Sequence, residues 1–300
     1  AKIAQWAAGA PKTPIFCQRP AITCPKPITT ARRHMIDTAS PNDSFRVVSL
    51  PHFARGGKWR TEAMRSYSQP LLIWFTKGQG RITVAGVTRG YGPHNAIYIP
   101  AGTMHGFDML GQVLGSILFF PTSTDFDLPA DHRHFRFRLA AQHTELNGLI
   151  ENIQREIGRG LPRQDMALVH HGGLLSVWLQ RQIDNSPDVE EDTDASRRLA
   201  AAFTALVERD FHLGKSVSRY AADLGVTPTH LSRVCNIACG RPASAILADR
   251  VHYEARRMLS QTRAPVKDIA THLGFTSAAY FTRSFQKQAG KTPTSFRKSQ

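Results

Sequence analysis

The feature that most constrains this chain is a pattern that occurs twice near its carboxyl end. In each copy an Ala stands four residues before a Gly, an Arg follows, and a second Gly lies seven residues beyond that Arg. Apolar residues recur at helical spacing before and after the first Gly, which can end a helix in a left-handed turn. Each copy therefore predicts a helix-turn-helix, in residues 217–240 (the first unit) and 266–290 (the second unit).

The second helix of each unit is predicted to place polar residues on its outer face. In the first unit that face holds Thr229, Ser232, Arg233 and Asn236, and in the second it holds Ala279, Thr282, Arg283 and Gln286. Leu231, Cys235 and Ala238 are predicted to face inward, as are Phe281, Phe285 and Ala289. A longer amphipathic helix, marked by Leu247, Val251, Ala255, Met258 and Leu259, is predicted to connect the two units.

Such a face fits the DNA major groove, which admits an α-helix and displays base edges. Arg233 and Arg283 are the main candidates for reading bases, because a guanidinium can bridge guanine O6 and N7. The alternative for each is a solvated or phosphate-contacting Arg. The full set of predicted DNA-contacting residues is Thr229, His230, Ser232, Arg233, Asn236, Ser277, Ala279, Tyr280, Thr282, Arg283, Gln286 and Lys291.

With these motifs, residues 196–300 closely resemble the AraC/XylS family of bacterial transcription regulators. The most specific part is Gly274-Phe-Thr-Ser-Ala-Ala-Tyr-Phe-Thr-Arg-Ser-Phe, together with Gly290-Lys-Thr-Pro293. The resemblance implies a seven-helix DNA-binding domain whose two recognition helices enter successive major grooves. Cys235 departs from the family, which usually has an aromatic residue there, as this chain has at Phe285.

The charge distribution supports a nucleic-acid module beside a second domain. The chain has a formal net charge of +15, and residues 196–300 carry 17 Lys and Arg against 6 Asp and Glu. Residues 35–195 carry 15 basic and 17 acidic residues, so that stretch is nearly neutral. A basic domain next to a near-neutral one indicates nucleic-acid binding coupled to another activity.

Between residues 44 and 138, short apolar runs separated by Gly predict strands. Four runs are marked, at residues 71–75, 81–84, 96–99 and 113–120, with turns at Gly78 to Gly80, Gly86 and Gly111. This spacing indicates a small barrel or jelly roll. Pro100-Ala-Gly-Thr-Met-His105 partly resembles the second motif of the cupin fold, a barrel that AraC-type regulators frequently carry as effector domain. The predicted fold class is α+β and multidomain, with a cupin-like jelly-roll barrel and an all-α DNA-binding domain.

The barrel is predicted to bind a small organic effector. Inward-facing candidates are Trp74, Tyr98, His105 and Phe119, and a plain packed core is the alternative. His94 and His105 lack further ligands at usable spacing, so neither a metal nor a cofactor is predicted.

The remaining segments connect or extend these domains. Residues 139–183 predict two helices, which either pack on their own barrel or pair two subunits. Residues 184–195 predict an acidic linker, and the Pro-rich residues 1–43 a disordered extension. Whether residues 1–34 are native is left open, since Met35 could be the natural start.

The predicted function is an effector-responsive transcription regulator, an activator, and not an enzyme. Its partners are double-stranded DNA, the effector, RNA polymerase and a second copy of the chain. The absence of an 18-residue apolar run predicts no membrane span, and unpaired cysteines fit the cytoplasm. The alternatives are a cupin enzyme fused to a DNA-binding domain, an alkylation-repair fusion, and a DNA binder without a ligand.

Overall fold

The computed structural model describes residues 43–55, 57–185 and 194–299. The predicted extension over residues 1–43 lies outside these ranges except for its last residue, and the predicted acidic linker over residues 184–195 lies outside them except for two residues at each end. The amino-terminal elements are β1 (Arg46–Ser49), α1 (Leu50–Phe53), η1 (Lys58–Arg60), β2 (Leu71–Val84), β3 (Val87–Tyr91), β4 (Asn95–Ile99), β5 (His105–Phe107), β6 (Leu110–Phe119), β7 (Arg133–Arg136), α2 (Ala140–Arg159) and α3 (Gln164–Asp184). The carboxyl-terminal elements are α4 (Ala195–Asp210), η2 (Phe211–Leu213), α5 (Val217–Asp223), α6 (Pro228–Cys239), α7 (Ala243–Gln261), α8 (Val266–His272), α9 (Ala278–Ala289) and α10 (Pro293–Lys298).

The strands form an antiparallel sheet built around β2. Five strands lie in the order β1-β6-β2-β4-β7, while β3 and β5 pair with the second half of β2. Among the described strands these pairs do not close into a ring. The structure therefore has the predicted antiparallel strands in its amino-terminal part and an all-α carboxyl-terminal part, but the pairing is not that of a closed jelly-roll barrel.

The turn predicted at Gly78 to Gly80 is wrong, because strand β2 runs through these residues. The strand is continuous over 14 residues, and its register against β6 shifts between Phe75 and Gln79. Gly78 has a φ of +88°, and a Cβ on Gly80 would lie 2.3 Å from the carbonyl oxygen of Asp108. Glycine is needed here for an irregular strand and a close neighbour, which gives the same sequence signal as a turn.

Both faces of the first half of β2 are buried. Leu72 and Trp74 belong to one apolar cluster, and the alternating Leu71, Ile73 and Phe75 belong to another. A strand buried on both faces reads as a continuous apolar run, which explains the sequence from residue 71 to 75.

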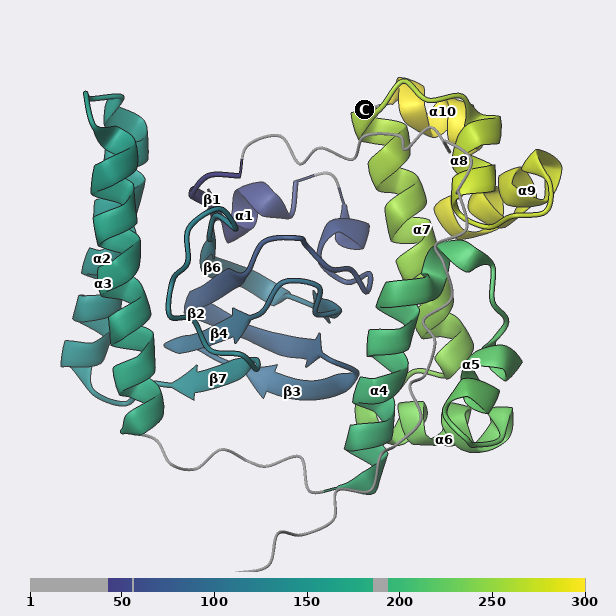
Figure 1. Cartoon of the computed structure of the whole chain (residues 1–300), viewed down its shortest axis with the longest axis horizontal. Coiled ribbons are helices and arrows are strands. Elements are labelled where there is room, and N and C mark those ends of the chain that lie inside the picture. The colour runs from purple at the N-terminus through teal and green to yellow at the C-terminus, as the bar shows by residue number, and fades with distance from the viewer. Residues whose placement is uncertain (1–42, 56, 186–193, 300) are drawn as a thin grey trace, which may run out of the picture. The chain divides into compact units, whose positions relative to one another are not determined.

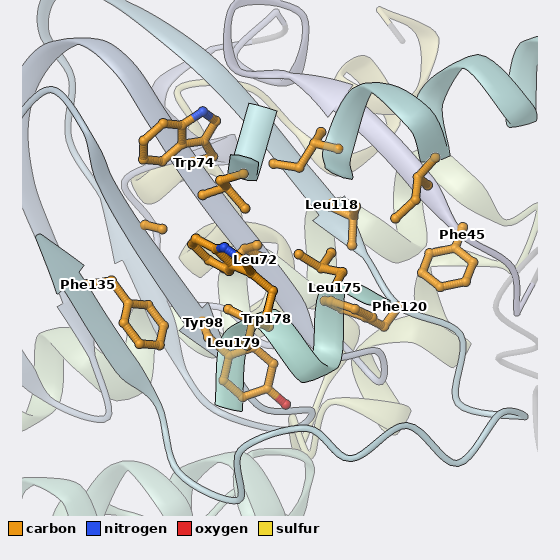
Figure 2. Close-up of a cluster of buried hydrophobic side chains, with 14 of the residues drawn as sticks. Phe45, Leu72, Trp74, Tyr98, Leu118, Phe120, Phe135, Leu175, Trp178 and Leu179 are labelled. Atoms are coloured by element: carbon orange, nitrogen blue, oxygen red, sulfur yellow. The ribbon is translucent and has the colours of Figure 1, made fainter. Parts of the chain in front are cut away.

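Helices α2 and α3 lie side by side and pack on the first of these clusters (Figure 1). Figure 2 shows Leu175, Trp178 and Leu179 of α3 gathered with Leu72 and Tyr98 of the sheet. The indole nitrogen of Trp178 also donates a hydrogen bond to Glu145 on α2, at 2.8 Å. Both helices therefore pack on the sheet of their own chain.

The carboxyl-terminal part consists of seven α-helices, α4 to α10, with α7 as the long connecting helix (Figure 1). A buried ion-pair network fastens α7 to α4. Arg250 donates to both carboxylate oxygens of Glu208, at 2.6 and 3.0 Å, and to Glu254 at 3.1 Å. Because buried charges are costly unless paired, this network fixes the position of α7 against α4.

Two loops of the amino-terminal part contact the helical part directly: the loop between η1 and β2, and the loop between β4 and β5. Met64 and Met104 share an apolar cluster with residues of α4, α5, α6 and α7. The amide of Met64 donates to Asp249 on α7 at 3.4 Å, and the hydroxyls of Tyr67 and Tyr253 lie 3.2 Å apart. Met64 and Met104, which lie in loops of the sheet part, therefore complete part of the helical core.

Candidate nucleic-acid interface

The first unit is a helix-turn-helix formed by α5 and α6. Ser216 caps α5 through the amide of Arg219, and Thr227 caps α6 through the amide of His230, at 3.3 and 3.2 Å. Between the helices Gly225 has a φ of +69°, a left-handed conformation that L side chains rarely adopt. The predicted helix, glycine turn and second helix are all present.

The second unit repeats this arrangement in α8 and α9. Ser277 caps α9 by accepting a hydrogen bond from the amide of Tyr280 at 3.1 Å. Gly274 has a φ of +75°, and a Cβ there would lie 2.4 Å from the backbone nitrogen of Gly214. The turn of the second unit is thus pressed against the backbone that follows η2.

Four of the six residues predicted to face inward are buried, whereas Ala238 and Ala289, near the ends of α6 and α9, are half-buried. Leu231 and Cys235 under α6, and Phe281 and Phe285 under α9, have no exposed surface. Burial raises the pKa of the Cys235 thiol to about 12, so this thiol stays protonated and packs as a small apolar group.

The predicted contact residues lie along the outer faces of α6 and α9. Three of the twelve are half-buried: His230, Ser232 and Thr282. The exposed members are Thr229, Arg233, Asn236, Ser277, Ala279, Tyr280, Arg283, Gln286 and Lys291. Arg233 lies 3.3 Å from His230, and within the described residues Arg283 has no ion-pair partner. Both guanidinium groups are therefore available to contact a ligand that binds against the outer faces of α6 and α9.

One exposed residue on α6 was not among the predicted contacts. Ile237 is 61% exposed, and it lines a shallow hollow with Pro228, Thr229, Ser232, Arg233 and Asn236. A helical wheel could have found it, because it lies one turn beyond Arg233 on the same side of the helix.

The four predicted effector residues do not lie around one cavity. Trp74 and Tyr98 pack in the cluster beneath α2 and α3, whereas Phe119 lies in the cluster on the other side of the sheet. His105 is buried beside the ring of Tyr67, which also contacts Phe119. Burial and nearby Arg65 lower the pKa of His105 to about 3, so its imidazole is neutral at physiological pH.

A separate hollow of about 470 Å³ lies where strands β2, β3 and β5 meet α6 and α7. Its polar lining includes Arg81, Thr83, Thr88, Arg241 and Arg256. Arg241 is paired with Asp249 at 2.6 Å, while Arg256 donates to the carbonyl of Gln288. This volume is in the range of small-molecule sites.

The part of the chain that the structure describes contains no cluster of three or more His, Cys, Asp or Glu arranged to hold a metal ion. His94 and His143 stack face to face at 3.8 Å, a geometry in which their ring nitrogens do not converge on one point. Burial, with a contribution from His143, lowers the pKa of His94. None of the described helices is both long enough and apolar enough to span a bilayer.

Residues 220–299 match a family model described as a helix-turn-helix domain. The virulence regulon transcriptional activator VirF of Yersinia enterocolitica is 28% identical over 91 residues, which are 30% of this chain and 34% of VirF. The right origin-binding protein of Escherichia coli K12 is 33% identical over 84 residues, 28% of this chain and 29% of that protein. The chain thus spans about a third or less of the length of these curated relatives.

Solved structures give weaker similarities. An apo variant of ToxT from Vibrio cholerae is 14% identical, with a TM-score of 0.41, over 85% of this chain and 97% of ToxT. A transcriptional regulator from Chromobacterium violaceum with an AraC-type DNA-binding domain is 24% identical, with a TM-score of 0.31, over 34% of this chain and 91% of that one. At TM-scores below 0.5 neither match establishes a shared fold for the whole chain.

Proposed function

We propose that this chain is a sequence-specific DNA-binding transcription regulator of the AraC/XylS type. The observation that carries the proposal is the pair of helix-turn-helix units joined by α7, each with an exposed Arg on its second helix. The net charge of +11 on residues 196–300 supports it, because Lys and Arg displace the counterions of DNA phosphates. A regulator of this kind acts in the compartment that holds the chromosome, which is the cytoplasm of a bacterium.

The direct test is binding of the full chain to a pool of random duplexes, followed by selection of preferred sequences. Affinity for the selected duplex should fall steeply with salt through counterion release. Arg283→Ala should cost about 1–3 kcal/mol at one or two base positions, because it removes a base contact. Lys291→Ala is the matched control, since a phosphate contact should weaken all duplexes similarly.

Arg233→Ala applies the same test to the first unit. Equal losses on all sequences for both Arg variants would reduce their role to phosphate contacts. A folded chain that binds no duplex at low salt would refute the proposed function.

We further propose that the sheet part binds a small organic effector, and that the site is the polar hollow beside α6 and α7 and not the four residues proposed from sequence. Thr83 and Thr88 line that hollow together with Arg241 of the helical part, so a ligand there would contact both parts of the chain. A ligand that binds only the folded state raises the melting temperature, which allows a metabolite library to be screened. A chelator should leave the melting temperature unchanged.

Two variants separate the two locations of the effector. Thr83→Phe fills the hollow and should abolish the ligand-induced rise in melting temperature. Trp74→Phe, in the core beneath α2 and α3, should preserve it. The reverse result would favour the site originally predicted around Trp74 and Tyr98.

We also propose that α3 pairs two copies of the chain. The side of α3 opposite its buried face carries an exposed apolar stripe of Met166, Val169, Leu174 and Val177. Leu174→Glu should convert a dimer to a monomer in sedimentation, whereas Gln154→Glu, at an exposed position of α2 outside the stripe, should not. A monomer at all concentrations for the unmodified chain would contradict this pairing.

Activation through RNA polymerase is the final part of the proposal, and in vitro transcription from the selected duplex tests it.

A further inference from the structure

Ile237 is a large apolar residue exposed on a helix whose other apolar side chains are packed inward. It is 61% exposed, whereas Leu231, Val234 and Cys235 on the same helix are almost fully buried. A single exposed apolar residue is common on protein surfaces, so exposure alone carries no argument. The position of Ile237 among its neighbours does carry one.

Ile237 continues the polar face of α6. It lies four residues after Arg233, next to Asn236, and it borders the shallow hollow that these residues line with Pro228, Thr229 and Ser232. Positions four apart on a helix are neighbours on its surface. A duplex seated against Arg233 and Asn236 would therefore reach Ile237 as well.

The second unit has a different residue at the corresponding position. Aligning Arg233 with Arg283 places Asn236 opposite Gln286 and Ile237 opposite Lys287, which is exposed. The two faces thus share an Arg and an amide but end in opposite chemistry. A lysine there suits a phosphate, whereas an isoleucine has no polar atom that could bind one.

We infer that Ile237 contacts the C5-methyl group of a thymine, which makes it a specificity-determining residue of the first unit. This inference rests on the proposed function. The thymine methyl is the apolar feature of the major groove, and apolar side chains recognise it by contact. In a homeodomain recognition helix, the residues that contact bases lie within a span of eight residues. The segment from His230 to Ile237 has the same length, so one helix can contact bases at both of its ends. The first unit would then read an apolar feature with a position at which the second unit has a lysine.

The test replaces each thymine of the selected duplex with deoxyuridine, one position at a time, because this change removes only the methyl group. The unmodified full chain should lose about fourfold in affinity at one position in one half-site, the factor expected for one buried methyl group. Ile237→Ala should bind the original duplex more weakly and should show no further loss on that uracil. Its melting temperature should be unchanged, because the side chain is exposed.

Lys287→Ala is the matched control from the second unit. It should keep the fourfold uracil effect while its salt dependence becomes shallower by about one released ion. The inference is wrong if Ile237→Ala does not abolish the loss of affinity at any uracil position, or if that variant weakens binding to every duplex equally. It is also wrong if Ile237→Ala binds DNA normally but loses transcription activation, which would make Ile237 a contact for RNA polymerase. Failure of the unmodified chain to bind any duplex is a distinct result that refutes the proposed function itself.

Discussion

The two helix-turn-helix units differ most beneath their second helices. Under α9, Phe285 contacts Phe281 and Phe296, with ring centroids 5.8 and 5.5 Å apart, and Phe275 contacts Phe281 at 5.1 Å. Under α6 the corresponding position is Cys235, and its cluster includes Met64 and Met104 from the sheet part. The rings that contact Phe285 come from residues 281 and 296, whereas the cluster around Cys235 includes residues more than a hundred positions away. The amino-terminal part reaches the second unit at the edge of its aromatic group, where Trp59 contacts Phe296 at 6.1 Å. Two copies of one motif can therefore differ in how far they stand alone.

The largest expected effect is that of removing the aromatic core of the second unit. Phe285→Ala should lower the free energy of unfolding by about 3–5 kcal/mol, because it leaves a cavity among packed rings. Cys235→Ala is the matched change in the first unit and should cost far less, because the two side chains differ little in size. Urea denaturation of both variants measures this contrast, and equal losses would abolish the distinction between the two cores.

The next effect tests whether the first unit depends on the sheet. Met64→Ala should cost about 2–3 kcal/mol, the lower part of the range for buried Met to Ala. The loss should appear in amide hydrogen exchange of α5 and α6 and leave α9 protected. Uniform loss of protection in both units would show that the sheet part supports the whole helical part alike.

Acidification should act more strongly on the second unit. His252 on α7 lies 3.3 Å from the hydroxyl of Ser284 on α9, and burial lowers its pKa to about 4. Between pH 6.5 and 4 the unfolded chain binds a proton that the folded chain excludes, so stability falls as the pH falls through this window. By pH 5 the loss from this group should be about 2 kcal/mol.

Hydrogen exchange of α9 at pH 7 and pH 5 measures this effect. His252→Gln, which does not titrate, is the control and should flatten the dependence. If the variant keeps the full pH dependence of α9, another group is responsible.

The smallest effect concerns the helix caps. Ser277→Ala should cost about 1 kcal/mol, because the amide of Tyr280 loses its acceptor. Thr227→Ala should cost less, since Pro228 at the first position of α6 is already restricted to a helical φ. Thermal denaturation of the two variants gives the comparison, and a larger loss for the Thr227 variant would reverse it.

The helix-turn-helix units could be predicted from the sequence because their determinants are local. Gly225, Gly274 and the cap Ser277 lie beside the turns and helices that they define, and the inward stripes repeat every three to four residues. No pairing between distant segments has to be known to find them.

The grouping of the four residues predicted to bind an effector could not be predicted in the same way, because it depends on strand register. Tyr98 pairs with Leu72 and so shares the face of Trp74, whereas Phe119 pairs with Leu71 and lies on the opposite face. Alternation within one strand sorts its own side chains into two sets, but it does not say which set of the next strand joins them. The polar hollow escaped prediction for the same reason, since Thr83 and Arg241 are brought together only by the tertiary fold.

The contact between Gly214 and Gly274 has a consequence for the DNA. Two backbones meet there with no room for a Cβ on either residue, and the Arg250 network fastens α7 to α4. We expect these contacts to hold α6 and α9 in one fixed arrangement relative to each other. One inserted base pair would move the second half-site by about 3.4 Å and rotate it by about 35° around the duplex axis. Two helices in a fixed arrangement cannot adjust to such a displacement of one half-site. An operator for this chain would tolerate almost no change in the spacing between its two halves.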